Sequence, residues 1–259
     1  MYFGLSEDQV FFQDNVRKFL EDQAPLDAIR KIAEGNDSSS KDELYQGLIN
    51  LGINNLLIPE DNGGLGLDLL FAVAISQSLG AGIATLPFIG PYVMAPIAIK
   101  HAANEMQKNT LFEGMVNNSI NFSIGFSEYF GSRDSSGLTF SQNKVSGKTL
   151  FVLDGDYASH VMLCNKEGQI GVVSLDSVGV ETINLTTVDK TRMYQEMNFD
   201  NTPIEILENS LTSSNAIELS IDAGRIVAAA DSIGASQYMI DKAIEYSKER
   251  KQFNRVIGS

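Results

Sequence analysis

The feature that most constrains this fold is a long stretch of helical pattern, residues 212–253, that contains no proline. Its apolar residues keep one broad face: Ile217, Ile221, Ile226, Ala230, Ile233, Met239, Ala243 and Tyr246. A helix of about forty residues cannot bury such a face alone, because protein helices are stabilised mainly by packing against other elements. The printed chain ends soon afterwards, at Ser259. We therefore expect that partners supply the covering surface or that the sequence is incomplete.

Two glycines, Gly224 and Gly234, lie inside this helical stretch. Each is expected to cost roughly 1 kcal/mol relative to alanine in a helix interior. A glycine at such a position indicates that another helix or a ligand approaches the backbone closely. Ser213 or Ser214 is expected to cap the start of the helix.

Residues 1–117 also follow a helical pattern, with apolar residues at intervals of three and four. The bounds of the expected helices are marked by cap signals: Ser6 with Gln9, Ser40 with Glu43, Gly52 as a C-cap, Asp68 as an N-cap, and Asn104 with Gln107. Two further helices are expected over 91–103 and 104–116. These apolar stripes are expected to form core.

Residues 118–208 change to short runs rich in β-branched residues, separated by turn signals such as Asp154-Gly155. The expected strands are Ser119–Phe126, Lys144–Leu153, His160–Cys164, Ile170–Leu175, Val178–Leu185 and Met193–Phe199. The predicted fold class is α+β. It comprises an N-terminal all-α domain (1–117), a middle antiparallel β-barrel or sandwich domain (118–208), and the first long helix of an incomplete C-terminal helical bundle (209–259).

Charge and composition exclude several classes of function. The net charge is −14 and the isoelectric point is near 4.5, which argues against nucleic-acid binding and against docking on anionic membranes. A single cysteine, Cys164, fits a reducing compartment. No leader pattern opens the chain and no apolar stretch is long enough to span a bilayer, so we expect a cytoplasmic protein without membrane insertion. His101 and His160 lack metal-ligand spacing, so no metal site is expected.

Four segments carry a family resemblance. The first is Ile58–Leu67, with the sequence Ile-Pro-Glu-Asp-Asn-Gly-Gly-Leu-Gly-Leu. It resembles the Pro-Glu-x-x-Gly-Gly-x-Gly loop of acyl-CoA dehydrogenases. Taken alone it is a glycine-rich turn, and it follows no strand that would make it a dinucleotide fingerprint.

The second segment, Ser127–Asp134, reads Ser-Glu-Tyr-Phe-Gly-Ser-Arg-Asp and looks like the Thr-Glu-Pro-x-x-Gly-Ser-Asp motif of that family. The resemblance implies that Phe126, Ser127 and Ser132 bind FAD and that Arg133 binds substrate. Backbone N–H groups and a hydroxyl at this strand end would stabilise the negative charge that a flavin gains on reduction. Tyr129 stands where the family has proline, and only a one-residue gap aligns Gly131-Ser132 with the family's Gly-Ser.

The third segment, Ser146–Gly155, resembles the family's Asn-Gly-x-Lys-x-Trp-Ile-Thr-Asn-Gly strand. There the tryptophan packs on the flavin and the threonine bonds to it, which implies FAD contacts for Phe151 and Leu153. Phe151 keeps an aromatic face, whereas Leu153 lacks the hydroxyl. The local alternative is an ordinary buried strand and turn.

The fourth segment is the long helix, in which Asp222-Ala-Gly-Arg225 precedes an alanine-rich run, Gly234, and Tyr246-Ser-Lys-Glu-Arg-Lys-Gln-Phe253. The family shows Arg, Ala-rich, Gly and Tyr-x-x-x-Arg-x-Gln-Phe-Gly at similar spacings. The resemblance implies that Asp222 and Arg225 lie near the acyl-CoA. It further implies that Arg250 and Gln252 reach the FAD of a neighbouring subunit, because a guanidinium can bind phosphate oxygens bidentately. From spacing alone, Arg250 is a solvated charge or an i,i+4 partner of Tyr246.

The resemblance covers the whole chain and implies FAD-dependent α,β-dehydrogenation of an acyl-CoA thioester to the trans-2-enoyl-CoA, as in fatty acid β-oxidation. Electron-transfer flavoprotein is the implied electron acceptor, and a homodimer or homotetramer is the implied assembly. The family's base is usually a glutamate well beyond the position of Phe253; in a minority it stands where this chain has Gly224. Glu218 faces elsewhere on the helix. No catalytic residue is therefore named, and the chain as written is expected to be unable to turn over.

Two other hypotheses remain. The chain could be a non-catalytic or FAD-deficient partner subunit of a heterotetramer, as in some bacterial acyl-CoA dehydrogenases. The departures from the flavin motifs favour this, whereas Arg250 and Gln252 oppose it. A stand-alone acyl-CoA binding module is disfavoured by the uncovered long helix.

Overall fold

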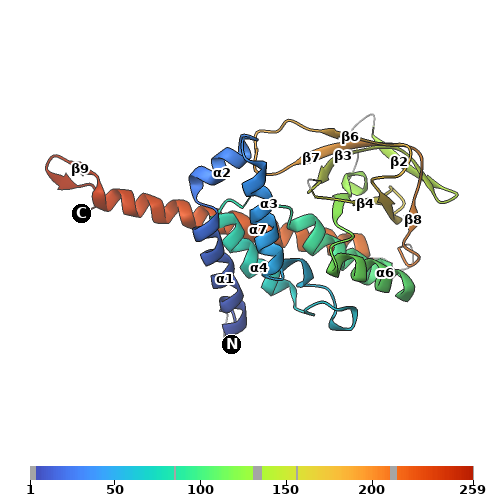
Figure 1. The fold of residues 1–259 in the computed structure, drawn as a ribbon, viewed down its shortest axis with the longest axis horizontal. Coiled ribbons are helices and arrows are strands. Elements are labelled where there is room, and N and C mark those ends of the chain that lie inside the picture. Colours follow the sequence, from blue (N-terminus) through green and yellow to red (C-terminus); the bar gives the residue numbers. More distant parts are fainter. Residues whose placement is uncertain (1–3, 85, 131–135, 156, 211–214, 259) are drawn as a thin grey trace.

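The computed structural model describes residues 4–84, 86–130, 136–155, 157–210 and 215–258. Helices and an eight-stranded sheet lie side by side, and one long helix runs past both and projects from the body (Figure 1). The expected α+β fold class is confirmed. Among the described residues, no helix is long and apolar enough to cross a membrane.

The N-terminal half is helical, as the spacing of apolar residues predicts. Two of the three predicted capping pairs form, at Ser6 with Gln9 and at Asn104 with Gln107, and Asp68 caps α4. The cap predicted at Ser40 is wrong, because α3 begins earlier and the Asp37 side chain accepts the Ser40 N–H. The elements are α1 Glu7–Gln23, α2 Leu26–Ala33, α3 Ser38–Asn50, η1 Ile53–Asn55, η2 Glu60–Asn62, α4 Leu69–Ala81, the π-helix η3 Gly90–Met94, α5 Ala95–Ala102 and α6 Glu105–Val116.

The second half is mainly one mixed sheet with the strand order β6-β7-β3-β1-β4-β5-β8, and β2 pairs with β3. The strands are β1 Phe122–Gly125, β2 Gly137–Ser141, β3 Lys144–Leu153, β4 His160–Cys164, β5 Ile170–Ser174, β6 Val180–Asn184, β7 Tyr194–Pro203 and β8 Glu205–Ile206. The expectation of a purely antiparallel sheet is wrong at one pair, because β1 and β4 are parallel. Parallel neighbours need a long connection, and the β2–β3 hairpin supplies it.

The core consists of two clusters that share the sheet. One joins the helices to one face of the sheet, where Phe122, Ile124 and Met162 are buried. The other covers the opposite face, with Val161 and Leu163. Because side chains alternate along a strand, β4 buries both of its faces and fixes the sheet against the helices.

The long helix is α7, Ala216–Glu249, and it crosses α4 at two glycines. A Cβ atom built on Gly234 would lie 1.9 Å from the carbonyl oxygen of Gln77, and one on Gly80 would lie 2.0 Å from that of Asp231. The predicted close approach of a helix is therefore confirmed at Gly234. The proposed caps Ser213 and Ser214 lie outside the described residues; Asn215 precedes the helix without a side-chain capping bond.

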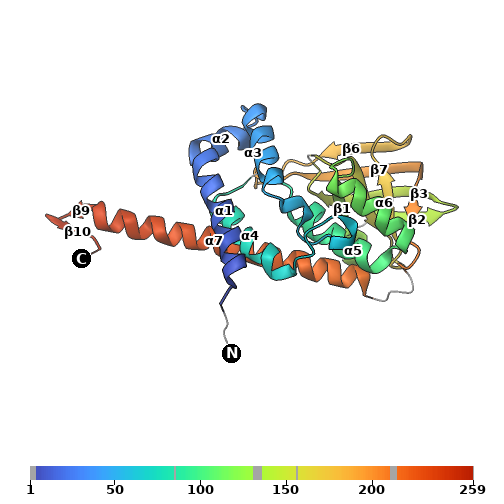
Figure 2. The same cartoon turned by 60° about the horizontal axis from the view of Figure 1, so that its bottom comes forward.

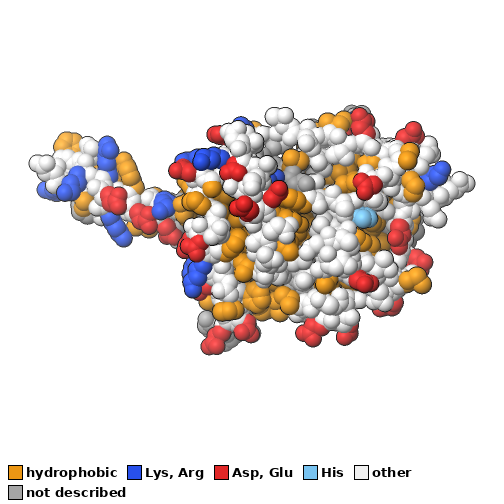
Figure 3. Space-filling model, in the orientation of Figure 1, with side chains coloured by type: hydrophobic (Ala, Val, Ile, Leu, Met, Phe, Trp, Pro, Cys, Tyr) orange, Lys and Arg blue, Asp and Glu red, His pale blue; other side chains and the backbone are white. Residues whose placement is uncertain are grey.

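The C-terminal part of α7 leaves the body of the molecule (Figures 1 and 2). It ends in a small hairpin of β9 Lys251–Gln252 and β10 Arg255–Val256. Large apolar side chains are exposed along the helix: Leu219, Ile226, Ile233, Met239, Ile240, Ile244 and Tyr246. Basic side chains gather on the projecting end (Figure 3).

Candidate functional site

A cavity of about 540 Å³ lies between α7, η3 and the ends of strands β1 and β3. We call it the α7 cavity. Segments far apart in the sequence line it together: η3 and its neighbour Ile89, the residues after β1, the end of β3, the loop before β7, and one face of α7. The predicted site residues that line it are Phe126, Ser127, Phe151, Leu153 and Arg225. The structure thus brings together residues that were proposed from three separate motifs.

The end of β1 is held in place by hydrogen bonds on both sides. The Phe126 carbonyl accepts from the Tyr129 N–H at 3.2 Å and from the Cys164 thiol at 3.7 Å. The Ser127 hydroxyl lies 3.2 Å from that of Thr149 on β3. Burial raises the pKa of the Cys164 thiol to about 12, so this side chain is a neutral packing group. These contacts fix the strand end beside the cavity.

The end of β3 carries an irregularity that exposes its aromatic residue. The register between β3 and β7 shifts between Thr149 and Val152, and Phe151 has φ +55°. Positive φ is uncommon for a bulky residue and occurs at bulges and strained functional positions. The Phe151 side chain is 46% exposed in consequence and lines the cavity, as does the half-buried Leu153.

The face of α7 forms the opposite wall. Gly224 leaves room for the Met94 side chain, whose sulfur would lie 2.8 Å from a Cβ there. Asp222 and Arg225, about one helical turn apart, form an exposed ion pair with an N–O distance of 2.8 Å. Near the start of the helix the Tyr129 hydroxyl donates to Glu218 at 3.3 Å, which ties the segment after β1 to α7.

A second ion pair, Arg192 with Asp231, joins the loop before β7 to α7 at 2.9 Å, and both side chains line the cavity. Each is largely buried, at 18% and 24% exposure. Burial lowers the pKa of the Arg192 guanidinium, but the carboxylates of Asp231 and Asp154 outweigh it, so that pKa lies above its ordinary value. Sequence reasoning missed this pair because nothing local links residues so far apart.

The carboxylates that line the cavity already have partners. Asp231 pairs with Arg192, and Asp189 accepts from the backbone N–H and hydroxyl of Thr191 at 2.8 and 2.6 Å. At Gly224 there is no side chain. The described residues therefore offer no carboxylate placed in the cavity as an uncommitted base, and the absence of a catalytic residue stays a prediction.

The remaining predicted residues lie elsewhere. Ser132 and Arg133 fall outside the described residues. Arg250 caps the end of α7 and Gln252 lies in β9, at the end that projects from the body (Figure 2). Their surroundings are basic although the chain is strongly acidic, since 242–255 contains two carboxylates, Glu245 and Glu249, against five cations: Lys242, Lys248, Arg250, Lys251 and Arg255. This end can attract an anionic group that the body of the protein would repel.

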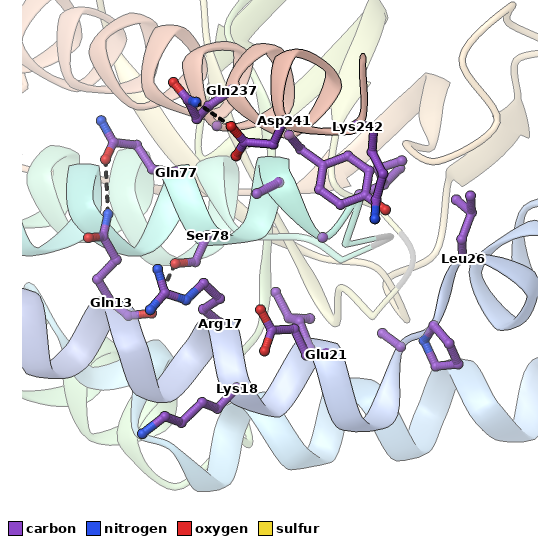
Figure 4. A pocket seen from close by; sticks show the side chains of 18 of the residues that line it. Gln13, Arg17, Lys18, Glu21, Leu26, Gln77, Ser78, Gln237, Asp241 and Lys242 are labelled. Carbon is purple, nitrogen blue, oxygen red and sulfur yellow. Dashed lines mark hydrogen bonds between the residues drawn. The ribbon is translucent and has the colours of Figure 1, made fainter. Parts of the chain in front are cut away.

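A larger cavity, about 860 Å³, lies between α1, α4 and α7 (Figure 4). Its polar side chains mostly bond to one another or to the helices: Gln13 donates to Gln77 at 2.9 Å, and Gln237 donates to Asp241 at 2.9 Å. None of the residues proposed to bind FAD or substrate lines it, although Gly234 of the fourth segment does. Within the described part of the chain, no cluster of three or more His, Cys, Asp or Glu side chains could hold a metal ion.

Comparison with known proteins agrees with the resemblance. Residues 6–119 match the family model "Acyl-CoA dehydrogenase, N-terminal domain". The whole chain is similar to the probable acyl-CoA dehydrogenase YngJ of Bacillus subtilis, with 24% identity over 73% of that protein. It is also 24% identical to the Caffeyl-CoA reductase-Etf complex subunit CarC of Acetobacterium woodii, again over the whole chain and 73% of that protein.

A solved structure shares the fold over the full length of the chain. It is the ChsE4-ChsE5 complex from Mycobacterium tuberculosis, with a TM-score of 0.84, 18% identity, and coverage of all of this chain and 71% of that one. The three related proteins are thus each matched over somewhat less than three quarters of their length.

Proposed function

We propose that this chain is part of an enzyme that oxidises an acyl-CoA thioester to the trans-2-enoyl-CoA with FAD. Residues 6–119 match the acyl-CoA dehydrogenase N-terminal domain, and the fold is that of the acyl-CoA dehydrogenases. The observation that carries the proposal is the α7 cavity. Residues from three motifs, at the ends of β1 and β3 and on α7, line the same space. Its volume is in the range of small-molecule sites, about 300–1,000 Å³.

The lining fits the ring of a flavin better than its diphosphate. The partly exposed Phe151 side chain and the apolar walls suit a flat ring, and Ser127 adds a hydroxyl beside it. The two cations of the lining, Arg192 and Arg225, are both engaged in ion pairs. The basic end of α7, with Arg250 and Gln252, suits a diphosphate. It projects from the body (Figure 1), and none of the residues that line the cavity belongs to it. We therefore propose that FAD is shared between two subunits.

When bound, FAD would supply the acceptor for the hydride that leaves the β-carbon. The residues of this chain would bind and orient the flavin ring and the acyl-CoA. Phe126 and Ser127 would direct backbone N–H groups and a hydroxyl at the ring and the thioester carbonyl. Asp222 and Arg225, exposed beside the cavity, would contact the CoA part. Electron-transfer flavoprotein is the proposed electron acceptor.

The second candidate function is a non-catalytic or FAD-deficient subunit that pairs with a homologous chain. Three observations favour it. Leu153 provides no hydroxyl, Gly224 has no side chain, and the carboxylates of the cavity lining are bonded. The related ChsE4-ChsE5 structure is itself a complex of two named proteins. In this case Arg250 and Gln252 would complete the FAD site of the partner.

The visible spectrum separates these candidates. The protein would be purified alone and after co-expression with a homologous chain. Flavin absorbance in the protein purified alone supports the first candidate. A protein that is colourless alone and yellow only with its homologue supports the second. Absence of flavin in both preparations would contradict an FAD role for this chain. The Arg250→Ala variant should lower flavin content, whereas Val178→Ala, exposed on the sheet side, should not.

A further inference from the structure

The α7 cavity changes character along the helix. Near Ile221 its walls are apolar, with Ile89 and Met94 facing the helix. About three turns further on, Asp231 and Ser232 line it together with Arg192. From Arg225 to Asp231 the helix rises about 9 Å, at 1.5 Å per residue. The exposed end, with Arg225, and the charged end, with Asp231, are therefore separated by about the length of a medium acyl chain.

At the charged end, Arg192 has hydrogen-bonding capacity left. A guanidinium carries five N–H donors, and one carboxylate can accept at most a bidentate pair. For Arg192 the described residues offer the single ion pair with Asp231. A saturated alkyl chain pushed against these donors would leave them without acceptors, which is costly in a buried site.

The charge around Arg192 decides what kind of acceptor fits. Asp231 lies 2.9 Å away, Asp154 acts on the same guanidinium, and Asp189 lines the same cavity. Two carboxylates, Asp231 and Asp154, therefore already act on this one guanidinium. An additional carboxylate from a ligand would be repelled, whereas a neutral oxygen could accept a hydrogen bond without adding charge.

We propose that Arg192, positioned by Asp231, is a specificity-determining residue that recognises a neutral oxygen acceptor, a ketone or a hydroxyl, on the acyl part of the thioester. The inference rests on the proposed function and names its substrate class. A site built to hydrogen-bond an oxygen rejects the analogue that lacks it, because its buried donors are then left unpaired. The Arg192–Asp231 pair thus selects oxygenated acyl chains over plain ones.

Binding of three thioesters tests the inference. Isothermal titration would compare octanoyl-CoA, the same thioester with a ketone in the outer half of the chain, and the CoA thioester of the matching dicarboxylic acid. The ketone is expected to bind about tenfold more tightly than octanoyl-CoA, the size of one hydrogen bond to a charged group. The dicarboxylic thioester is expected to bind no better than octanoyl-CoA.

Variants test whether the preference for the ketone thioester depends on the Arg192–Asp231 pair. Arg192→Met with Asp231→Leu should abolish the preference for the ketone while octanoyl-CoA still binds. Lys148→Met with Glu196→Leu removes a similarly buried ion pair between β3 and β7, outside the cavity, and should keep the preference. Arg192→Lys, which keeps the charge but loses the planar fork, should reduce it and serves if the double variant fails to fold.

Several results would overturn the inference. They are equal binding of ketone and plain thioester, tightest binding of the dicarboxylic one, or an unchanged preference in the Arg192 variants. In each of these cases octanoyl-CoA still binds and the proposed function stands. If none of the three thioesters binds, both the inference and the proposed function fail.

Discussion

At Gly234 the structure leaves no room for a side chain. The carbonyl oxygen of Gln77 occupies the place where a β-carbon would be, and Gly80 meets the Asp231 carbonyl in the same way. The two helices therefore touch backbone to backbone. A methyl group here cannot be accommodated by a side-chain rotation, because the atoms that it meets belong to the main chain.

We expect Gly234→Ala to lower the free energy of unfolding by about 3 kcal/mol, the upper part of the range for overpacking. This sign is opposite to that of an ordinary helical site, where alanine is better than glycine. Urea denaturation followed by circular dichroism measures the change. Ser236→Ala, exposed two residues further along α7, is the control and should stay within about 0.5 kcal/mol of the wild type. Equal stabilities of the two variants would contradict the crossing geometry.

Sequence reasoning singles out residues where a local pattern exists. Gly234 stands out as a glycine in a helical run, and Phe126, Ser127, Phe151 and Leu153 lie in recognisable motifs. The positive φ of Phe151 could not be predicted, because it follows from a register shift against β7. Arg192 and Asp231 look like ordinary surface charges in the sequence, and only tertiary packing makes them neighbours.

Among the elements, α6 shows how one side chain joins two regions of the chain. Gln107 closes the capping box at Asn104 and donates from its Nε2 to Glu205 and to the Ile206 carbonyl, each at 2.9 Å. Its Oε1 also accepts the Glu208 N–H at 3.0 Å. The same amide therefore satisfies both the helix start and the backbone around β8.

We expect Gln107→Ala to cost about 2–3 kcal/mol, more than the ~1 kcal/mol typical of a lost cap, because buried backbone groups near β8 lose their partners as well. Thermal unfolding followed by circular dichroism gives the comparison. Thr110→Ala on the exposed side of the same helix removes only a bond to the Met106 carbonyl and should change stability little. A Gln107→Ala loss no larger than that control would refute the bridging role.

Element bounds were predictable where caps or long alternating runs exist. β3 and β4 begin and end as predicted, and the caps at Ser6, Asp68 and Asn104 form. The short α2, β2 and β8 were missed, since a two- to eight-residue element carries too little periodicity to be distinguished from a loop. The parallel pairing of β1 with β4 is a matter of topology, which no local pattern encodes.

The whole molecule combines an acidic body with a basic, apolar extension. Along α7, Leu219, Ile226, Ile233 and Ile240 recur every seven residues and are all exposed. Such a stripe at heptad spacing is typical of a helix that packs against other helices. The proposed sharing of FAD between subunits requires a contact of this kind near the basic end.

We expect Ile240→Glu with Ile244→Glu to weaken self-association or association with a homologous chain, because two charges would have to be buried in an apolar contact. Light scattering coupled to gel filtration measures the mass of the assembly. The control is Val178→Glu, a fully solvated valine on the sheet side, 89% exposed. The same mass for the double variant and the wild type across concentrations would show that this part of α7 is not a contact surface.

The contact between α4 and α7 at Gly80 and Gly234 also determines the direction in which the end of α7 projects. Since α7 is one continuous helix, the fifteen or so residues from Gly234 to its end extend about 22 Å at 1.5 Å per residue. A tilt of about five degrees at the crossing would displace Arg250 by about 2 Å, enough to break a hydrogen bond. In the proposed assembly, the position of Arg250 relative to a neighbour's cofactor would therefore depend on the contact that Gly80 and Gly234 make inside the helical half.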